Sequence, residues 1–384
     1  MRMNIETQQD TKNRPALANP SPEYKPMPAI HIPYSPLVIK AGAHARKLLA
    51  RQGLPAASVA TLPGAAGGPK AIGITGLDQA VFEWLNRNPR RRELVGASIG
   101  GWRFACAMQA EPSQALARLA ARYTEESYAA DSSVTDITRQ TRLMLDEILP
   151  PAARSALIDH PHYQLSLLLV RSHGLLASEA RAALLGGLAL SAALNTVSRG
   201  LLRHAFSRVI CHDPRSALRF KPEDDIPTLC QPLGTDNLDA ALMGTIAIPG
   251  VLNGVQLPGA PAATYRDGGL TDYHLDFPFA QGDDIVLYPH FTDRIVPGWF
   301  DKFLPWRRSS PAHHANTVLI APSPDYLARL PGGKLPDRKD FHRYLGRDAQ
   351  RQQVWRQATA ESQRLGDAFM AWLERPDLGQ VQAL

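Results

Sequence analysis

Cysteine is scarce in this sequence. The 384 residues include only three cysteines, Cys106, Cys211 and Cys230, and none of them forms a C-x-x-C pair. Three cysteines are a poor number for a disulfide framework, so a reducing compartment is the simpler expectation. We therefore expect a cytoplasmic protein.

Long apolar runs are missing as well. No run of about 18 apolar residues occurs, so the sequence predicts no membrane-spanning helix. The first residues, "MRMNIETQQDTKNRP", lack the apolar core of a secretory signal. These absences leave peripheral docking on a membrane surface open.

A strong excess of charge is also lacking. The chain has 42 lysines and arginines against 36 acidic residues, and this net charge of +6 favours anionic surfaces without identifying one. No nucleic-acid-reading motif is present, so we expect no nucleic-acid partner. Hydrophobic residues, by contrast, make up 44% of the chain, which is enough for a sizeable core.

Strand-like apolar runs alternate with helical patterns along most of the chain. This alternation indicates an α/β fold with a largely parallel central sheet. Expected strands begin the segments 57–68 and 91–109 and occupy 163–170, 206–212, 228–233, 284–291 and 316–323. Expected helices follow the first two strands and occupy 37–53, parts of 113–148, 178–195 (a buried helix), 237–250 and 339–374.

A possible nucleophile lies in "GASIG" (96–100), which fits the pattern G-x-S-x-G. Ser98 stands where a strand passes into a helix, and the small residues around it permit a strained turn that exposes the hydroxyl. The beginning of a helix also favours developing negative charge nearby. The alternative reading is a tight turn with a serine N-cap.

A serine hydroxyl needs a base, and one downstream segment offers one. In "YRDGGLTDYHLDFPF" (265–279), Asp267 is followed by two glycines, which favour a tight turn with little crowding of the carboxylate. A plain turn is the commoner meaning of D-G-G.

Four short motifs in this order resemble the patatin-like phospholipase family. Its oxyanion loop G-G-G-x-[RK]-G aligns with "AGGPKA" (66–71), and its nucleophile elbow is matched by "GASIGG". Its A-S-x-A-x-P helix aligns with "GTIAIP" (244–249), and its D-G-[GA] motif is matched at 267–269. The resemblance covers roughly residues 57–280 and implies a three-layer α/β/α fold.

The resemblance also implies a mechanism without a cofactor or metal. Ser98 would attack an ester carbonyl, Asp267 would accept its proton, and the amides of Gly67 and Gly68 would hold the oxyanion. Lys70 would reinforce the positive potential of this loop, in which alanines replace two family glycines and Pro69 has no N–H to offer. The glycines that support the motifs are Gly96, Gly100, Gly268 and Gly269.

The implied function is a lipid acyl hydrolase, similar to phospholipase A or lysophospholipase. On this reading, 1–36 form a polar, proline-rich arm, 37–325 a patatin-like catalytic domain, and 326–384 a C-terminal helical segment. The substrate is expected to be a lipid or another acyl ester. Headgroup, chain length and oligomeric state stay undetermined by the sequence.

Two alternatives stay open. The first is an α/β-hydrolase triad of Ser98 with Asp267 or Asp272 and with His274 or His290, although these histidines are expected to be ordinary surface or loop residues. The second is a catalytically silent lipid-binding or scaffold protein on the same fold. Adjacent histidines in "AHHAN" (312–316) lack a spaced third ligand and do not predict a metal site.

One segment suggests contact with a membrane. "VPGWFDKFLPWRRSS" (296–310) places aromatic residues beside basic ones, a combination that suits a lipid headgroup region. A core-covering loop or a partner contact explains it equally well. The candidate contact residues are Trp299, Phe300, Phe303, Trp306, Arg307 and Arg308.

Overall fold

The computed structural model describes residues 35–384 apart from 130, 219 and 221–223. The predicted N-terminal arm therefore lies almost entirely outside the described residues. The described residues form one compact unit, so the C-terminal segment belongs to the same unit as the motifs.

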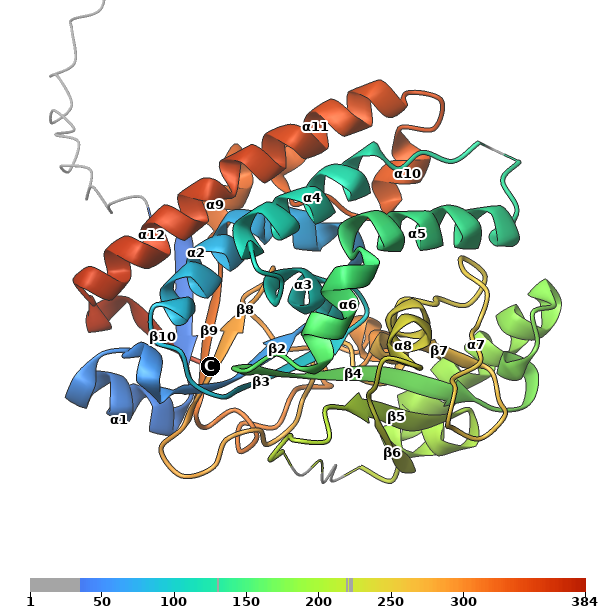
Figure 1. Ribbon diagram of the computed structural model, residues 1–384, viewed down its shortest axis with the longest axis horizontal. Coiled ribbons are helices and arrows are strands. Elements are labelled where there is room, and N and C mark those ends of the chain that lie inside the picture. Colours follow the sequence, from blue (N-terminus) through green and yellow to red (C-terminus); the bar gives the residue numbers. More distant parts are fainter. Residues whose placement is uncertain (1–34, 130, 219, 221–223) are drawn as a thin grey trace, which may run out of the picture. The chain divides into compact units, whose positions relative to one another are not determined.

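The fold is α/β, with one mixed sheet whose centre is parallel (Figure 1). The strand order is β10-β1-β9-β8-β2-β3-β4-β5-β6, and β7 pairs with β4 beside this path. Neighbours from β9 to β4 run parallel, whereas β1–β9, β4–β5 and β4–β7 are antiparallel. The strands are β1 (Leu37–Ala41), β2 (Val59–Gly64), β3 (Arg92–Ala97), β4 (Tyr163–Ser172), β5 (Phe206–His212), β6 (Thr228–Pro232), β7 (Tyr265–Asp267), β8 (Ile285–Pro289), β9 (Thr317–Pro322) and β10 (Val381–Ala383).

Helices flank this sheet, an arrangement compatible with three layers. The α-helices are α1 (Ala43–Gln52), α2 (Thr75–Asn86), α3 (Ile99–Ala107), α4 (Pro112–Glu125), α5 (Val134–Ile148), α6 (Pro151–Ile158), α7 (Arg181–Val197), α8 (Leu238–Thr245), α9 (Pro324–Arg329), α10 (Lys339–Arg343), α11 (Asp348–Glu361) and α12 (Gln363–Glu374). Short 3-10 helices include η2 (Gly68–Ile74), η5 (Gly268–Leu270) and η6 (Trp299–Phe303).

The central strands are buried on both faces, which explains their continuous apolar sequence. All six residues of β3 and nearly all of β4 are buried. Because β2 and β3 are parallel neighbours, the loops after Gly64 and Ala97 leave the same edge of the sheet. The oxyanion-loop candidate and the serine turn are therefore brought together by the topology alone.

Several predicted elements need correction. Residues 37–41 form strand β1, because the alternating "LVIKA" pairs with β9, and the helix begins only after Gly42. The expected helix 339–374 is three helices: Gly346, with φ 72°, separates α10 from α11, and Ser362, whose backbone stays helical, stands between α11 and α12. The helix expected over 237–250 ends at Thr245, ahead of Pro249.

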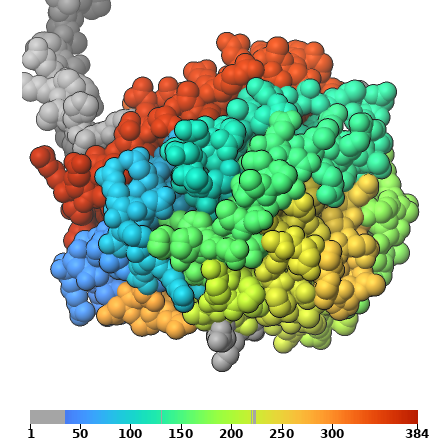
Figure 2. Space-filling view, viewed as in Figure 1, coloured from blue at the N-terminus to red at the C-terminus, as the bar shows by residue number. Residues whose placement is uncertain are grey.

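The C-terminal helices pack closely on the motif-bearing part. In Figure 2 the red C-terminal segment lies along the top of the view, against segments coloured cyan and green. Gly76 of α2 and Gly366 of α12 meet at this junction, where Ser362 Oγ accepts a hydrogen bond of 2.9 Å from the Gly76 amide. A Cβ on Gly76 would lie 2.4 Å from the Ser362 carbonyl oxygen.

We predict that Gly76→Ala destabilises the fold by about 1–3 kcal/mol, because the added methyl group cannot fit between the two backbones. The expected result is a lower urea midpoint with an unchanged slope. Gly186→Ala is the matched control, since its nearest neighbour would be 3.7 Å away and alanine favours a helix. An unchanged midpoint for Gly76→Ala would mean that α12 can move away at little cost.

Candidate active site

Ser98 occupies a strained turn between β3 and α3. Its backbone has φ 55° and ψ −132°, and among the described non-glycine residues only Leu275 shares a positive φ. A methyl group on Gly100 would lie 2.0 Å from the Gly64 carbonyl oxygen, and one on Gly96 would lie 2.5 Å from Gly101 Cα. The small residues of G-x-S-x-G are therefore required by close backbone contacts.

A hydrogen-bonded threonine holds this turn. The Ser98 amide donates to Thr245 Oγ1 over 2.9 Å, and Thr245 Oγ1 donates to the Leu168 carbonyl over 2.6 Å. Thr245 thus links the serine turn to β4 from the end of α8. The sequence marked this residue only through its place in "GTIAIP".

Asp267 lies in hydrogen-bond contact with Ser98. Ser98 Oγ donates to Asp267 Oδ2 over 2.7 Å, and Asp267 Oδ1 accepts from the Gly269 amide over 2.7 Å. Both side chains are buried. A methyl group on Gly268 would lie 2.2 Å from the Leu168 carbonyl oxygen, so this turn can approach β4 only with glycine.

Burial weakens the acidity of Asp267. Desolvation raises the pKa of this carboxyl to about 6, against the opposing effects of its hydrogen bonds with Ser98 and Gly269 and of the nearby Arg338 and Lys302. A carboxylate with a raised pKa is a better base near neutral pH.

The loop after β2 lies beside this pair. Gly68 has φ 57°, a conformation that favours glycine, and it borders the same cavity as Ser98. A methyl group on Gly67 would lie 2.4 Å from the Phe291 ring, and one on Gly269 would lie 2.6 Å from Ala66 Cβ. Gly67 and Gly68 remain predicted oxyanion donors, and Gly68 lines the same cavity as Ser98.

Arg338 and Lys302 act electrostatically on Asp267, and Lys70 in turn acts on Lys302. Arg338 lies against Gly68, with Nη2 3.2 Å from the position of a Cβ there, and Lys302 Nζ lies 3.7 Å from the centre of the Tyr273 ring. Lys70 Nζ is 5.2 Å from the centre of the Phe291 ring. Burial, together with Lys70 and Arg338, lowers the pKa of Lys302 to about 7. Sequence reasoning missed Arg338 and Lys302, since neither belongs to a motif.

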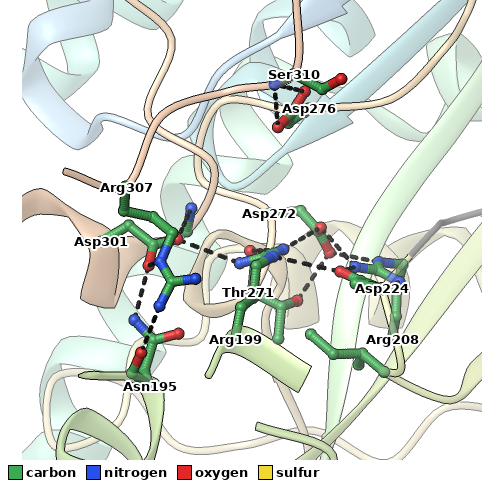
Figure 3. Close-up of polar contacts among 12 residues, drawn as sticks. Asn195, Arg199, Arg208, Asp224, Thr271, Asp272, Asp276, Asp301, Arg307 and Ser310 are labelled. Carbon is green, nitrogen blue, oxygen red and sulfur yellow. Dashed lines mark hydrogen bonds and ion pairs between the residues drawn. The ribbon is translucent and has the colours of Figure 1, made fainter. Parts of the chain in front are cut away.

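A buried ionic network anchors the chain just beyond Asp267 (Figure 3). Arg208 donates to both carboxylate oxygens of Asp272, at 2.7 and 2.9 Å. Arg199 bonds the Thr271 carbonyl at 2.7 Å and bridges Asp272 to Asp301. Asp272 is therefore fully engaged with arginines and is not free to orient a histidine.

The two candidate triad histidines lie in loop segments, one of the two expected placements, but they are buried and not on the surface. His274 Nδ1 accepts from the Val296 amide at 3.0 Å, and His290 Nδ1 accepts from the Thr292 amide at 2.9 Å. Burial lowers the pKa of His290 to about 3 and that of His274 well below its usual value. In a triad this nitrogen would instead donate to a carboxylate.

An apolar cavity of about 420 Å³ opens beside Ser98. A few polar groups, among them Glu126, Tyr128 and Arg338, also line it. A pocket of this size and polarity is typical of small-molecule sites. Its apolar lining includes Ile99, Trp102, Ile137, Met144, Ile246, Val251, Leu252 and Phe341.

The predicted membrane segment is only partly exposed. Trp299, Phe303 and Trp306 are exposed, but Phe300 is buried in a hydrophobic cluster, so Phe300 is no surface contact. Arg307 is half-buried and donates to the Asn195 carbonyl at 2.8 Å.

No helix of the described residues has the length and apolar character needed to cross a bilayer. His313 and His314 both hydrogen-bond Asp276, at 2.9 and 3.0 Å.

The chain matches no protein-family model and no curated protein. The site is therefore interpreted from its own geometry.

We predict that Asp267→Asn stabilises the folded protein at pH 8, because it removes a buried charge while keeping a side chain of the same shape. A carboxyl whose pKa is raised on folding favours the folded state below its unfolded pKa of 3.8 and disfavours it above the folded value of about 6. The free energy of unfolding of Asp267→Asn should exceed that of wild type by about 3 kcal/mol above pH 7, and the two should be equal near pH 4.

Denaturant titrations at several pH values measure this difference. Asp367→Asn, on the exposed face of α12, is the control and should change stability by less than about 0.5 kcal/mol. A stability gain for Asp267→Asn that does not vary with pH would contradict the assignment.

Proposed function

We propose that this protein is a serine acyl-ester hydrolase of the patatin-like type, acting on lipid acyl esters. The observation that carries the proposal is the direct 2.7 Å hydrogen bond from Ser98 Oγ, on a strained elbow, to a buried carboxylate. The resemblance of four ordered motifs and the apolar cavity beside Ser98 support it.

In the proposed reaction, Ser98 Oγ attacks the ester carbonyl while Asp267 accepts its proton. The tetrahedral oxyanion is held by amides of the loop at Gly67 and Gly68, with Arg338 adding positive potential. The leaving alcohol takes this proton back from Asp267 as the carbon–oxygen bond breaks and the acyl-enzyme forms. Water activated by Asp267 then releases the acid and regenerates the serine.

The apolar cavity suits the acyl part of the substrate. Its walls come from α3, α5 and the segment after α8, which approach Ser98 from one side. The exposed aromatic residues of η6 and Trp306 support peripheral contact with a membrane as the source of such substrates.

The triad reading has less support. Ser98 Oγ donates to Asp267, and the Nδ1 atoms of His274 and His290 accept backbone hydrogen bonds that a triad histidine could not make. A silent scaffold would give no reason to keep a strained serine bonded to a buried carboxylate.

We predict that a fluorophosphonate probe labels the wild type and not Ser98→Ala, and that Ser98→Ala lowers p-nitrophenyl ester turnover at least about a thousandfold. Asp267→Asn should lower turnover by a similar order, since it removes the base. His290→Asn, which preserves an acceptor near Nδ1, is the matched control and should retain turnover within a few-fold.

Retained turnover in Asp267→Asn together with its loss in His290→Asn would transfer the assignment to a triad. Absence of both labelling and turnover in a folded wild type would favour the scaffold.

We also predict an acid limb near pH 6 in the pH profile of kcat/KM. Asp267 acts as a base only when ionised, and its pKa is raised to about 6, so activity should fall about tenfold per pH unit below that value. Steady-state hydrolysis of a water-soluble ester measures the limb. A midpoint near pH 4, where a solvated aspartate titrates, would argue against Asp267 as the base.

A further inference from the structure

Helix α7 exposes an apolar face to solvent. Its inward side carries Leu184, Gly187, Ser191 and Asn195, and after the exposed Arg181 at its first position the helix contains no charged residue. Leu185, Leu190 and Val197 are 58, 56 and 79% exposed. A surface helix normally directs polar residues outward, so this face is built to be covered. Its exposed residues are Ala182, Leu185, Gly186, Ala189, Leu190, Ala192, Ala193, Thr196 and Val197.

The inward side of α7 is fixed to the aromatic segment. Asn195 of α7 donates to Asp301 of η6 at 2.7 Å, which fixes the two helices to each other. Phe303 and Trp306 of this segment are 76 and 63% exposed, and Trp299 is also exposed. The exposed residues of α7 and these three aromatic side chains are here called the apolar face.

A basic cavity of about 470 Å³ adjoins the same segment. Its cationic lining residues are Lys40, Arg294, Lys302, Arg307 and Arg308. Its two carboxylates are already engaged, because Asp293 pairs with Lys40 at 2.8 Å and Asp301 accepts bonds from Asn195 and Gly298.

Three of the cations have no carboxylate partner. Within the part of the chain that the structure describes, Arg294, Lys302 and Arg308 make no ion pair with an acidic side chain, and Arg294 and Arg308 are exposed. Lys302 faces Lys70, Arg338 and the Tyr273 ring, and Asp267 is the one acid among the groups that shift its pKa. Positively charged side chains therefore outnumber negatively charged ones in the lining of this cavity.

We propose that the apolar face docks on a lipid bilayer and that the basic cavity binds the phosphate of an anionic lipid headgroup. The inference deepens the proposed function, on which the idea of lipid substrates rests. Apolar residues would enter the acyl boundary while Arg294 and Arg308 contact headgroup phosphates, an arrangement typical of interfacial helices.

Charge complementarity favours a bilayer over a second copy of this chain. A second copy of this chain would bring its own net charge of +6, including the same cavity cations, and so offers no excess of negative charge to them. An anionic bilayer matches both the apolar and the basic parts.

The experiment is sedimentation with vesicles of phosphatidylcholine, alone or with about one third phosphatidylglycerol, to supply a negative surface potential. Wild type should bind the anionic vesicles and bind phosphatidylcholine vesicles much more weakly. Arg294→Gln/Arg308→Gln should reduce binding to anionic vesicles roughly 30-fold, since each surface cation contributes a factor of about five.

Matched variants separate the contributions. Arg51→Gln/Arg91→Gln removes the same charge at exposed positions outside the cavity and should change vesicle binding by less than about twofold. Leu185→Ser/Val197→Ser should reduce binding at least about tenfold through lost apolar contact. Both substituted side chains are exposed, so circular dichroism should show an unchanged fold.

The proposal would be overturned if Arg294→Gln/Arg308→Gln bound anionic vesicles as well as wild type does. It would also be overturned if Arg51→Gln/Arg91→Gln lost as much vesicle binding as Arg294→Gln/Arg308→Gln. Binding of glycerol phosphate without vesicle binding would point to a free phosphate ligand and would also overturn it. A wild-type dimer in light scattering that becomes a monomer in Leu185→Ser/Val197→Ser would assign the face to a second copy.

The test is independent of hydrolysis. Ser98→Ala should bind vesicles like wild type. Vesicle binding without ester turnover would support this inference and contradict the proposed reaction. Turnover of a soluble ester without vesicle binding would support the proposed reaction and contradict this inference.

Discussion

The hydrogen bond between Ser98 and Asp267 is the constraint around which the described structure is arranged. It joins residues 169 positions apart and requires two turns to meet over the ends of β3 and β7. Gly96, Gly100 and Gly268 each remove a methyl group that would collide with backbone atoms in this space. Thr245 and the Arg199–Asp272–Arg208 network then hold the two turns from outside. A strained serine persists only where its surroundings fix it so completely.

Electrostatics around the pair show a balance between two opposing effects. Burial raises the pKa of Asp267 to about 6, whereas Arg338 and Lys302 lower it. Burial, together with the charges of Lys70 and Arg338, lowers the pKa of Lys302 to about 7. One buried carboxylate thus faces two cations, an excess that suits chemistry in which negative charge develops on the substrate.

The sequence predicted the parts of the site that depend on local backbone geometry. G-x-S-x-G and D-G-G are short because close backbone approach dictates glycine at fixed spacing, and the order of strands and helices followed from apolar periodicity. Arg338 and Lys302 could not be found this way, since they reach the site from distant segments with no characteristic neighbours. The burial of His274 and His290 was missed for a related reason: polar residues in an irregular segment carry no periodicity that would reveal burial. Residues 37–41 are too few for periodicity to distinguish a strand from the start of a helix.

The apolar composition of helix α7 gives a wrong prediction of its burial. Its apolar composition predicts a buried helix, yet only one side is covered within the described residues. An exposed apolar arc costs free energy in water and is retained only when another phase or partner covers it. The neighbouring cations make a neutral apolar partner a poor match, because their charges would be desolvated without compensation.

Lys302 lines the basic cavity and also lowers the pKa of Asp267, so an anion bound in that cavity would raise the pKa of Asp267. The basic cavity and the candidate active site therefore share one lysine.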